Sequence, residues 1–253
     1  TFKAMTVCLE LEYIILIILG FLSEILGTMA GFGSSTIFLP LASYLVEFKT
    51  ALVLVAIFHL FGNVSRITFF RHGLDWNVLL IFGIPSFVLS LIGATLVGNL
   101  SQTFLKLMLG IFLIVLSVLF LTKPKLAFPA KRKSLVLGGG ISGFIVGLIG
   151  TGGALRASFL TGLKMEKEKY IATSAVVALG TDATRIPYYI SAGFLLEQYY
   201  YLIPFLFVSA FLGSYVGKKI VTRIDQEKFK KMVLIAIILV SIKFIFDGIT
   251  ASL

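Results

Sequence analysis

The chain has 253 residues, of which 58% are hydrophobic and 13% charged, and its formal net charge is +10. A soluble domain carries roughly twice that charged fraction, so the composition excludes a soluble globular protein and indicates one that spans a membrane several times. The positive charge does not indicate nucleic-acid binding, because lysines and arginines gather in the connections between apolar runs, as positive-inside topology requires. Because Cys8 is the only cysteine, the chain cannot form an intrachain disulfide framework. With two histidines besides, the sequence predicts no metal site, and we expect no cofactor.

Apolar runs follow one another along the chain, and several reach the roughly 20 residues that cross ~30 Å of hydrocarbon. We expect segments at 11–30, 34–46, 51–70, 78–97 and 104–121, then at 135–149, 154–163, 171–190, 199–216 and 232–246. The first has no small-residue cleavage site and is interpreted as a retained span. The segments at 34–46 and 154–163 are short and follow glycine clusters. Each is therefore predicted to form, with the segment before it, a hairpin that turns inside the membrane.

A shift of 119 residues aligns the second half of the chain with the first. The most informative match is Arg66 with Arg185, because arginine is rare inside apolar runs, and Asn63 or Asp182 precedes each by three residues. Smaller residues match as well: Gly20 with Gly139, Ser23 with Ser142, Gly33 with Gly152, Pro85 with Pro204 and Ser90 with Ser209. We therefore expect two membrane repeats, residues 1–121 and 135–253, joined by a basic cytoplasmic linker at 122–134.

The distribution of charge predicts the topology. With the two hairpins re-entrant, fifteen lysines and arginines fall in the connections at 71–77, 121–134, 163–170 and 217–231, whereas the other side holds Lys3, Lys49 and Lys106. Each half has an odd number of segments, so the second half enters the membrane from the opposite side. The predicted fold is an all-α polytopic membrane protein with two inverted-topology repeats. Each repeat is a broken or re-entrant helical hairpin plus three transmembrane helices, and both termini lie outside.

The two glycine clusters are the first candidate site. A helix that begins inside the membrane points free N–H groups and a positive dipole end at the membrane centre, and two such ends converging form an anion site. Close helix packing is the alternative reason for glycine there. The candidate substrate-binding residues of the clusters are Gly31, Gly33, Ser34, Ser35, Thr36, Gly150, Thr151, Gly152 and Gly153.

Intramembrane charges form the second candidate site. The guanidinium groups of Arg66 and Arg185 match the geometry of oxyanions, although both side chains could instead snorkel to the surface. Asp182 can neutralise Arg185, and Asn63 is its uncharged counterpart. Arg156 follows the second glycine cluster, has no counterpart in the first half and is a candidate charge partner of the substrate.

Three titratable residues are candidates for proton coupling. Glu24, His59 and Asp182 lie in apolar runs, where a carboxylate or an imidazole could relay protons. The alternative is a structural role, as a satisfied core histidine or a carboxylate at the edge of a cavity. The sequence leaves both open.

At these positions the chain resembles the TauE/SafE family of sulfite-exporter-like transporters. The resemblance covers essentially the whole chain and rests on the duplication, the Gly-Phe-Gly-Ser-Ser run from Gly31, the Gly-Thr-Gly-Gly run from Gly150, and the paired motifs that end at Arg66 and Arg185. It implies a permease of the prokaryotic cytoplasmic membrane for sulfite, sulfoacetate or related organosulfur anions. Ser34 stands where the second half has Gly153, so the two clusters are not identical.

Together these features predict a secondary transporter that moves a small sulfur oxyanion by alternating access around a midplane site, in the direction of export. The alternatives are an anion channel and a carrier for a carboxylate or another anion. We expect no enzymatic activity and no nucleic-acid partner. The expected partners are the anion, the lipid bilayer and a second copy of the chain in a homodimer.

Overall fold

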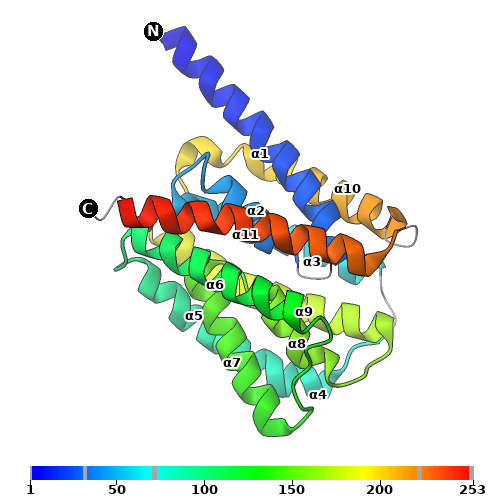
Figure 1. The fold of residues 1–253 in the computed structure, drawn as a ribbon. Helices are drawn as coiled ribbons and strands as arrows, with labels where there is room; N and C mark the ends of the chain where they lie inside the picture. The colour runs from blue at the N-terminus through cyan, green and yellow to red at the C-terminus, as the bar shows by residue number, and fades with distance from the viewer. Residues whose placement is uncertain (1, 31–32, 70–72, 221–223, 251–253) are drawn as a thin grey trace.

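The computed structural model describes residues 2–30, 33–69, 73–220 and 224–250, and in these ranges all regular structure is helical (Figure 1). The first half contains α1 (Phe2–Ala30), α2 (Ser35–Ala42), α3 (Phe48–Phe69), α4 (Trp76–Val78), the π-helical turn η1 (Leu79–Gly83), α5 (Ile84–Val97) and α6 (Gln102–Thr122). The second contains α7 (Arg132–Ile149), α8 (Gly153–Thr161), α9 (Lys167–Ser191), the 3-10 turn η2 (Glu197–Tyr199), α10 (Leu202–Ile220) and α11 (Gln226–Thr250). The N-terminal part of α1 extends beyond the bundle (Figure 1).

The helices agree with the segments expected from hydropathy, and the all-helical membrane fold is confirmed. Within the described ranges, six helical stretches are long and apolar enough to cross a bilayer: Leu11–Ala30, Phe48–Phe69, Trp76–Val97, Gln102–Thr122, Arg132–Ile149 and Leu202–Ile220. The helices α9 and α11 are longer than most of these but carry more polar and charged side chains. The two short helices, α2 and α8, have eight and nine residues, about 12–14 Å at 1.5 Å per residue, which is too short to cross.

The two halves interlock. In the tertiary contacts α1 packs on α10 and α7 packs on α5, so each opening helix lies against the fourth segment of the other half. The equivalent helices α3 and α9 pack together at the centre, and α6 packs on α11. Exchanging the halves leaves this pattern of neighbours unchanged. It is the pattern that two repeats related by a two-fold axis produce.

Hydrogen bonds at both ends of the central pair show that α3 and α9 are antiparallel. At the start of α3, Thr50 Oγ1 donates to Phe194 O, just beyond the end of α9, at 3.0 Å. At the other end, Asp75 N donates to Thr173 Oγ1 near the start of α9 at 3.0 Å, and Lys169 Nζ lies 3.2 Å from Asp75 Oδ2. Equivalent helices of inverted repeats would run in this way, whereas the side from which each half enters the membrane stays a prediction.

The ion pair of Asp75 with Lys169 has the same place in the duplication as the contact of Phe194 with Thr50. Partial burial acts to raise the pKa of the Asp75 carboxyl, but the Val78 N–H and the Lys169 ammonium outweigh it and hold that pKa below its ordinary value. Asp75 therefore stays charged and paired at neutral pH. One end of the α3–α9 pair is fastened by an ion pair, and the other by a neutral hydrogen bond.

The linker between the halves is attached to α8. Phe128 stacks on Phe159 with ring centroids 4.2 Å apart, and its N–H donates to Ser158 O at 3.0 Å. A Cβ on Gly162 would lie 2.0 Å from Phe128 O, so the backbones are in close contact. The linker therefore packs on the end of α8.

Close backbone contact joins α7 to the span formed by η1 and α5. Three glycines spaced four residues apart on α7 lie on one face, where the absence of side chains allows this approach. A Cβ would meet a carbonyl oxygen of the facing helix at each of them: on Gly139 at 2.2 Å from Phe82 O, on Gly143 at 2.1 Å from Ser86 O and on Gly147 at 2.0 Å from Ser90 O. The π-helical turn lies in this contact, since Phe82 belongs to η1.

Replacing Gly143 with alanine should separate these helices. We expect Gly143→Ala to cost about 1–3 kcal/mol through overpacking, seen as a melting temperature in detergent lower by roughly 2–10 °C. Gly98→Ala is the matched control, because a Cβ at Gly98 meets its nearest atom at an ordinary 3.7 Å. Equal melting temperatures for the two variants would contradict the tight contact.

Candidate functional site

The structure brings the two glycine clusters together. Gly33 and Gly150 have φ angles of +85° and +79°, in the left-handed region that favours glycine. The Thr36 and Thr151 hydroxyl oxygens, from the first turn of α2 and the second cluster, are 2.9 Å apart and buried. The predicted convergence is thus present in the geometry, although Gly31 lies outside the described residues.

The first turns of α2 and α8 carry backbone N–H groups with no acceptor inside their helix. Ser34 precedes α2 and makes no side-chain cap bond, and its buried hydroxyl has no hydrogen-bond partner among the described residues. Ser35 begins α2 and is buried. In the second half Gly152 precedes α8, which begins at Gly153, so the cap there also has no side chain to offer. Neither helix start is therefore capped by the side chain of the residue that precedes it.

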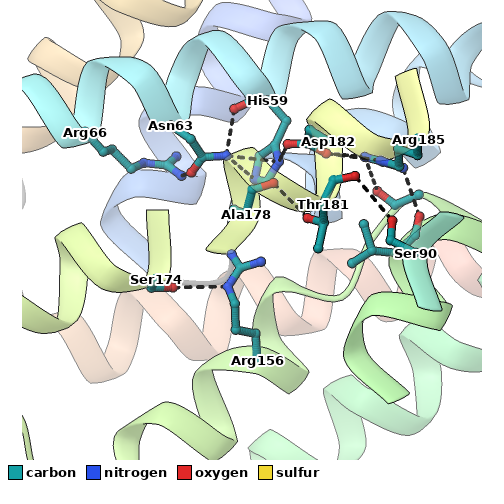
Figure 2. Close-up of polar contacts among 12 residues, drawn as sticks. His59, Asn63, Arg66, Ser90, Arg156, Ser174, Ala178, Thr181, Asp182 and Arg185 are labelled. Carbon is teal, nitrogen blue, oxygen red and sulfur yellow. Dashed lines mark hydrogen bonds and ion pairs between the residues drawn. The ribbon is translucent and has the colours of Figure 1, made fainter. Parts of the chain in front are cut away.

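A chain of buried polar side chains runs through the contact between α3 and α9 (Figure 2). His59 Nδ1 lies 2.7 Å from Asp182 Oδ2, and Asp182 Oδ1 accepts from Arg185 Nε at 3.1 Å and Nη2 at 2.8 Å. On the other side of His59, Asn63 Nδ2 donates to His59 O at 2.8 Å, and Arg66 Nη1 donates to Asn63 Oδ1 at 3.2 Å. Asn63 and Asp182, predicted as counterparts, therefore belong to one network.

Arg185 is held on every side by protein. Besides Asp182, it donates to Val146 O at 2.9 Å and to Gly150 O at 3.5 Å, which are carbonyls at the end of α7. Tyr189 adds a hydrogen bond to Gly147 O in the same turn. A cation at a helix C-terminus compensates the unpaired carbonyls there. These hydrogen bonds to protein acceptors indicate a structural function for Arg185 at the second glycine turn.

Arg66 is paired differently, with a carboxylate from α1. Its Nη2 lies 2.6 Å from Glu24 Oε1, which also accepts from Ser214 Oγ on α10 at 2.6 Å. Glu24 is fully buried, fits against Gly62 and Gly213, and has no partner for Oε2 among the described residues. Glu24 and His59 are therefore not isolated titratable groups, since each has a charged neighbour.

Arg156 lies in the first turns of α8 and has a different environment. It is 5% exposed, and its one hydrogen bond among the described residues runs from Nε to Ser174 Oγ on α9 at 3.1 Å. No described carboxylate forms an ion pair with it. Its guanidinium points toward the row of Asn63, His59 and Asp182 (Figure 2). Arg66 and Arg185 are matched by carboxylates, so Arg156 leaves one positive charge unmatched.

The polar surroundings extend from the centre toward one end of the α3–α9 pair. On α3 exposure rises toward the end of the helix, from Ala51 and Val55, which are fully buried, to Arg66, whose side chain is 12% exposed. On the antiparallel α9, Asp182 is buried, and the polar side chains of Ser174 and Tyr170, nearer its start, are partly exposed. Partly exposed polar side chains therefore lie at the end at which α3 ends and α9 begins. The opposite end belongs to the apolar core.

Sequence reasoning missed the residues that support this site. Ser174 stands one helical turn after Tyr170 and two turns before Asp182 on α9, so a polar stripe at helical spacing was a signal that could have identified it. Ser214 and Tyr189 gave no such signal, because their partners, Glu24 and the end of α7, are distant in sequence.

The pairing of Arg185 predicts a double-mutant result. Arg185→Gln removes the cationic partner of the buried Asp182 carboxylate and a donor to two carbonyls, which should cost about 3–5 kcal/mol. Adding Asp182→Asn removes the unmatched charge and should recover part of this loss. The exposed pair of Lys243 and Asp247 is the control, since the same changes there should cost at most about 1 kcal/mol. If the decrease in melting temperature of the double variant equalled the sum of the decreases of the two single variants, the result would contradict a buried ion pair of Asp182 with Arg185.

Comparisons with known proteins agree with this architecture. The family model described as "Sulfite exporter TauE/SafE" matches residues 16–244. The chain is 28% identical over 255 residues to the "Probable membrane transporter protein MJ0441" of Methanocaldococcus jannaschii, covering 90% of this chain and 95% of that protein. No solved structure matches the chain. The protein described above, with its two interlocked helical halves, belongs to the TauE/SafE family and is a membrane transporter.

Proposed function

We propose that the protein carries a small sulfur oxyanion, sulfite or an organosulfonate, across the membrane. The anion binds where the first turns of α2 and α8 meet, with Arg156 as its charge partner. Its binding residues come from the two glycine clusters, and the paired arginines hold the surrounding frame. The transport involves no chemical step and takes place in the cytoplasmic membrane, with both termini outside and a homodimer as the expected assembly.

The observation that carries the proposal is the unmatched charge of Arg156. A charge held inside a membrane protein costs several kcal/mol unless a partner compensates it. The buried carboxylates Glu24 and Asp182 are already paired with Arg66 and Arg185. An anion that neutralises Arg156 would therefore be stabilised there, and the planar guanidinium suits two oxygens of one oxyanion.

The groups around Arg156 favour a small, oxygen-rich ligand. The two helix starts, the Ser34 hydroxyl and the hydroxyl pair of Thr36 and Thr151 provide N–H and O–H groups of the kind that donate to oxyanions. The description of the matching family as sulfite exporters supports sulfur oxyanions within this class. A carboxylate has the same donors to use, so the test includes carboxylates.

The polarity gradient supports alternating access. The polar end of the α3–α9 pair is the side at which the charge pattern predicts the cytoplasm, because the connections at 71–77 and 163–170 lie there. The other end is closed by buried apolar residues such as Leu52 and Leu54 of α3. We infer that this conformation offers its site to the cytoplasm. The reverse conformation would open the apolar end while the two interlocked halves exchange arrangements.

Export is the direction that the membrane potential favours. An inside-negative potential supplies ~2.3 kcal/mol per elementary charge per 100 mV to an anion that leaves the cell. Flux from inside-positive and inside-negative liposomes distinguishes export from coupled uptake. Counterflow of labelled anion against unlabelled anion distinguishes a carrier from a channel, because a channel shows none.

The central test replaces Arg156. Arg156→Gln should lower the affinity for sulfite at least tenfold, and lower flux in liposomes correspondingly, because the anion loses its charge partner. Arg156→Lys, which keeps the positive charge, should recover part of the lost affinity. Arg132→Gln is the matched control, since Arg132 is exposed at the start of α7. Binding would be measured by calorimetry with sulfite, thiosulfate, sulfoacetate, taurine and acetate. Equal affinity for all anions in Arg156→Gln and Arg132→Gln would contradict the proposal.

Thiol labelling tests the direction of access. In a Cys8→Ser background, Ser174→Cys should react with a membrane-impermeant maleimide added from the cytoplasmic side, and bound anion should slow the reaction. Val55→Cys is the control at the equivalent position of the duplication, and its fully buried site should react at least tenfold more slowly. Comparable labelling at both positions, or labelling of Ser174→Cys from outside alone, would overturn the inferred orientation.

A further inference from the structure

His59 connects the polar chain to the first glycine turn. The residue is 4% exposed and lies in the middle of α3. Its Nδ1 is 2.7 Å from Asp182 Oδ2, and a carboxylate engaged with Arg185 can only accept there. The proton of a neutral His59 therefore lies on Nδ1, which leaves the lone pair on Nε2.

The Nε2 atom faces the candidate anion site. A Cβ built on Gly33 would lie 3.2 Å from Nε2, so the imidazole edge packs directly against the turn that precedes α2. The remaining polar contact of Nε2 is a long one, 3.5 Å to Asn63 Nδ2. A proton added at Nε2 would create both a new N–H donor and a new positive charge next to the start of α2.

The charged groups around His59 come from several elements. The α9 helix contributes Asp182 and Arg185, α8 contributes Arg156, and α3 itself contributes Arg66, which is paired with Glu24 of α1. The described residues of α2 that face this region carry hydroxyls. The ionisable side chains of the other packed helices, α6 and α10, lie toward helix ends: Lys106, Tyr215, Lys218 and Lys219. With His59 neutral the cluster keeps one unmatched positive charge, that of Arg156, and with His59 protonated it keeps two.

We propose that His59 is the proton-binding residue of the transporter and that its protonation sets the charge of the anion that the site accepts. Neutral His59 suits a singly charged anion, and protonated His59 suits a doubly charged oxyanion such as sulfite in its fully ionised form. The proton binds reversibly at Nε2, and no covalent bond between heavy atoms changes. The equivalent position in the second half is Ala178, so one repeat alone carries this group. The inference rests on the proposed function, because it assigns the charge of the same ligand.

Thermodynamic linkage requires that protonation of His59 and binding of the anion favour each other by the same factor. If a doubly charged anion binds more tightly to the protonated site, its affinity rises as pH falls, by up to about tenfold per pH unit for one proton taken up. The bound anion must in turn favour protonation of His59. A proton that travels with a dianion leaves one negative charge to cross the membrane.

The experiment compares two anions whose charge does not change between pH 5.5 and 8, sulfate and methanesulfonate. In the wild-type protein we expect sulfate affinity to rise at least tenfold on acidification while methanesulfonate affinity changes less than threefold. His59→Gln should remove the pH dependence for sulfate, and His72→Gln, which replaces the other histidine of the chain, should retain it. Calorimetry at a series of pH values in detergent provides the measurement.

A second readout does not depend on the His59 variant being folded. In wild-type protein labelled with 15N-histidine, one of the two imidazoles should titrate at higher pH when sulfate is present, and His72→Gln identifies that imidazole as His59. Sulfate binding with the same pH dependence in wild type and His59→Gln, or a His59 titration that sulfate does not move, overturns the His59 proposal while the anion site stands. Absence of binding by both anions at every pH overturns the proposed function together with it.

Discussion

Charge inside the bilayer has to be matched within the protein, and this constraint organises the molecule. The contact between α3 and α9 contains the chain of polar side chains that satisfies it, from Arg66 through His59 to Arg185. Carboxylates reach this chain from two sources, Glu24 of α1 and Asp182 of α9. Because Arg66 pairs with Glu24 of α1, and Arg185 donates to carbonyls at the end of α7, the network also fixes the positions of α1, α7 and the second glycine turn. The unmatched guanidinium of Arg156 is prominent because everything around it is matched.

The two halves are symmetric in the arrangement of their helices but differ in the polar residues they carry, and these two properties have separate functions. Duplication provides two helix starts that meet at Thr36 and Thr151 and two equivalent helices that cross the centre. Substitutions at equivalent positions then make the halves different: Arg156 opposite Ile37, His59 opposite Ala178, Ser174 opposite Val55. A symmetric frame allows two related conformations, whereas the unique residues provide one anion site and one proton site. The ion pair of Asp75 and Lys169 at one end, and the neutral bond of Thr50 at the other, extend this difference to the two faces.

Much of the fold could be predicted from sequence, because hydropathy and duplication are strong local signals. The segments, the short helices after the glycine clusters and the pairing of Asp182 with Arg185 one turn apart all followed from spacing along the chain. The π-helical turn at Leu79–Gly83 did not, since no residue type marks it. The partner of Arg66 could not be predicted either, because Glu24 is 42 residues away and its counterpart position, Gly143, carries no charge. The interlocking of α1 with α10, and of α7 with α5, depends on packing between halves that periodicity does not encode.

We propose that an oxyanion binds between the two helix starts, against Arg156. Selenite has the shape of sulfite and carries an anomalous scatterer, so diffraction from crystals grown with selenite at the selenium edge locates the ligand directly. We expect a selenium peak beside the Arg156 guanidinium and the first turns of α2 and α8, and no such peak in crystals of Arg156→Gln. A selenium peak beside Arg66 or Arg185 instead, or a peak of equal height between the helix starts in Arg156→Gln, would contradict it.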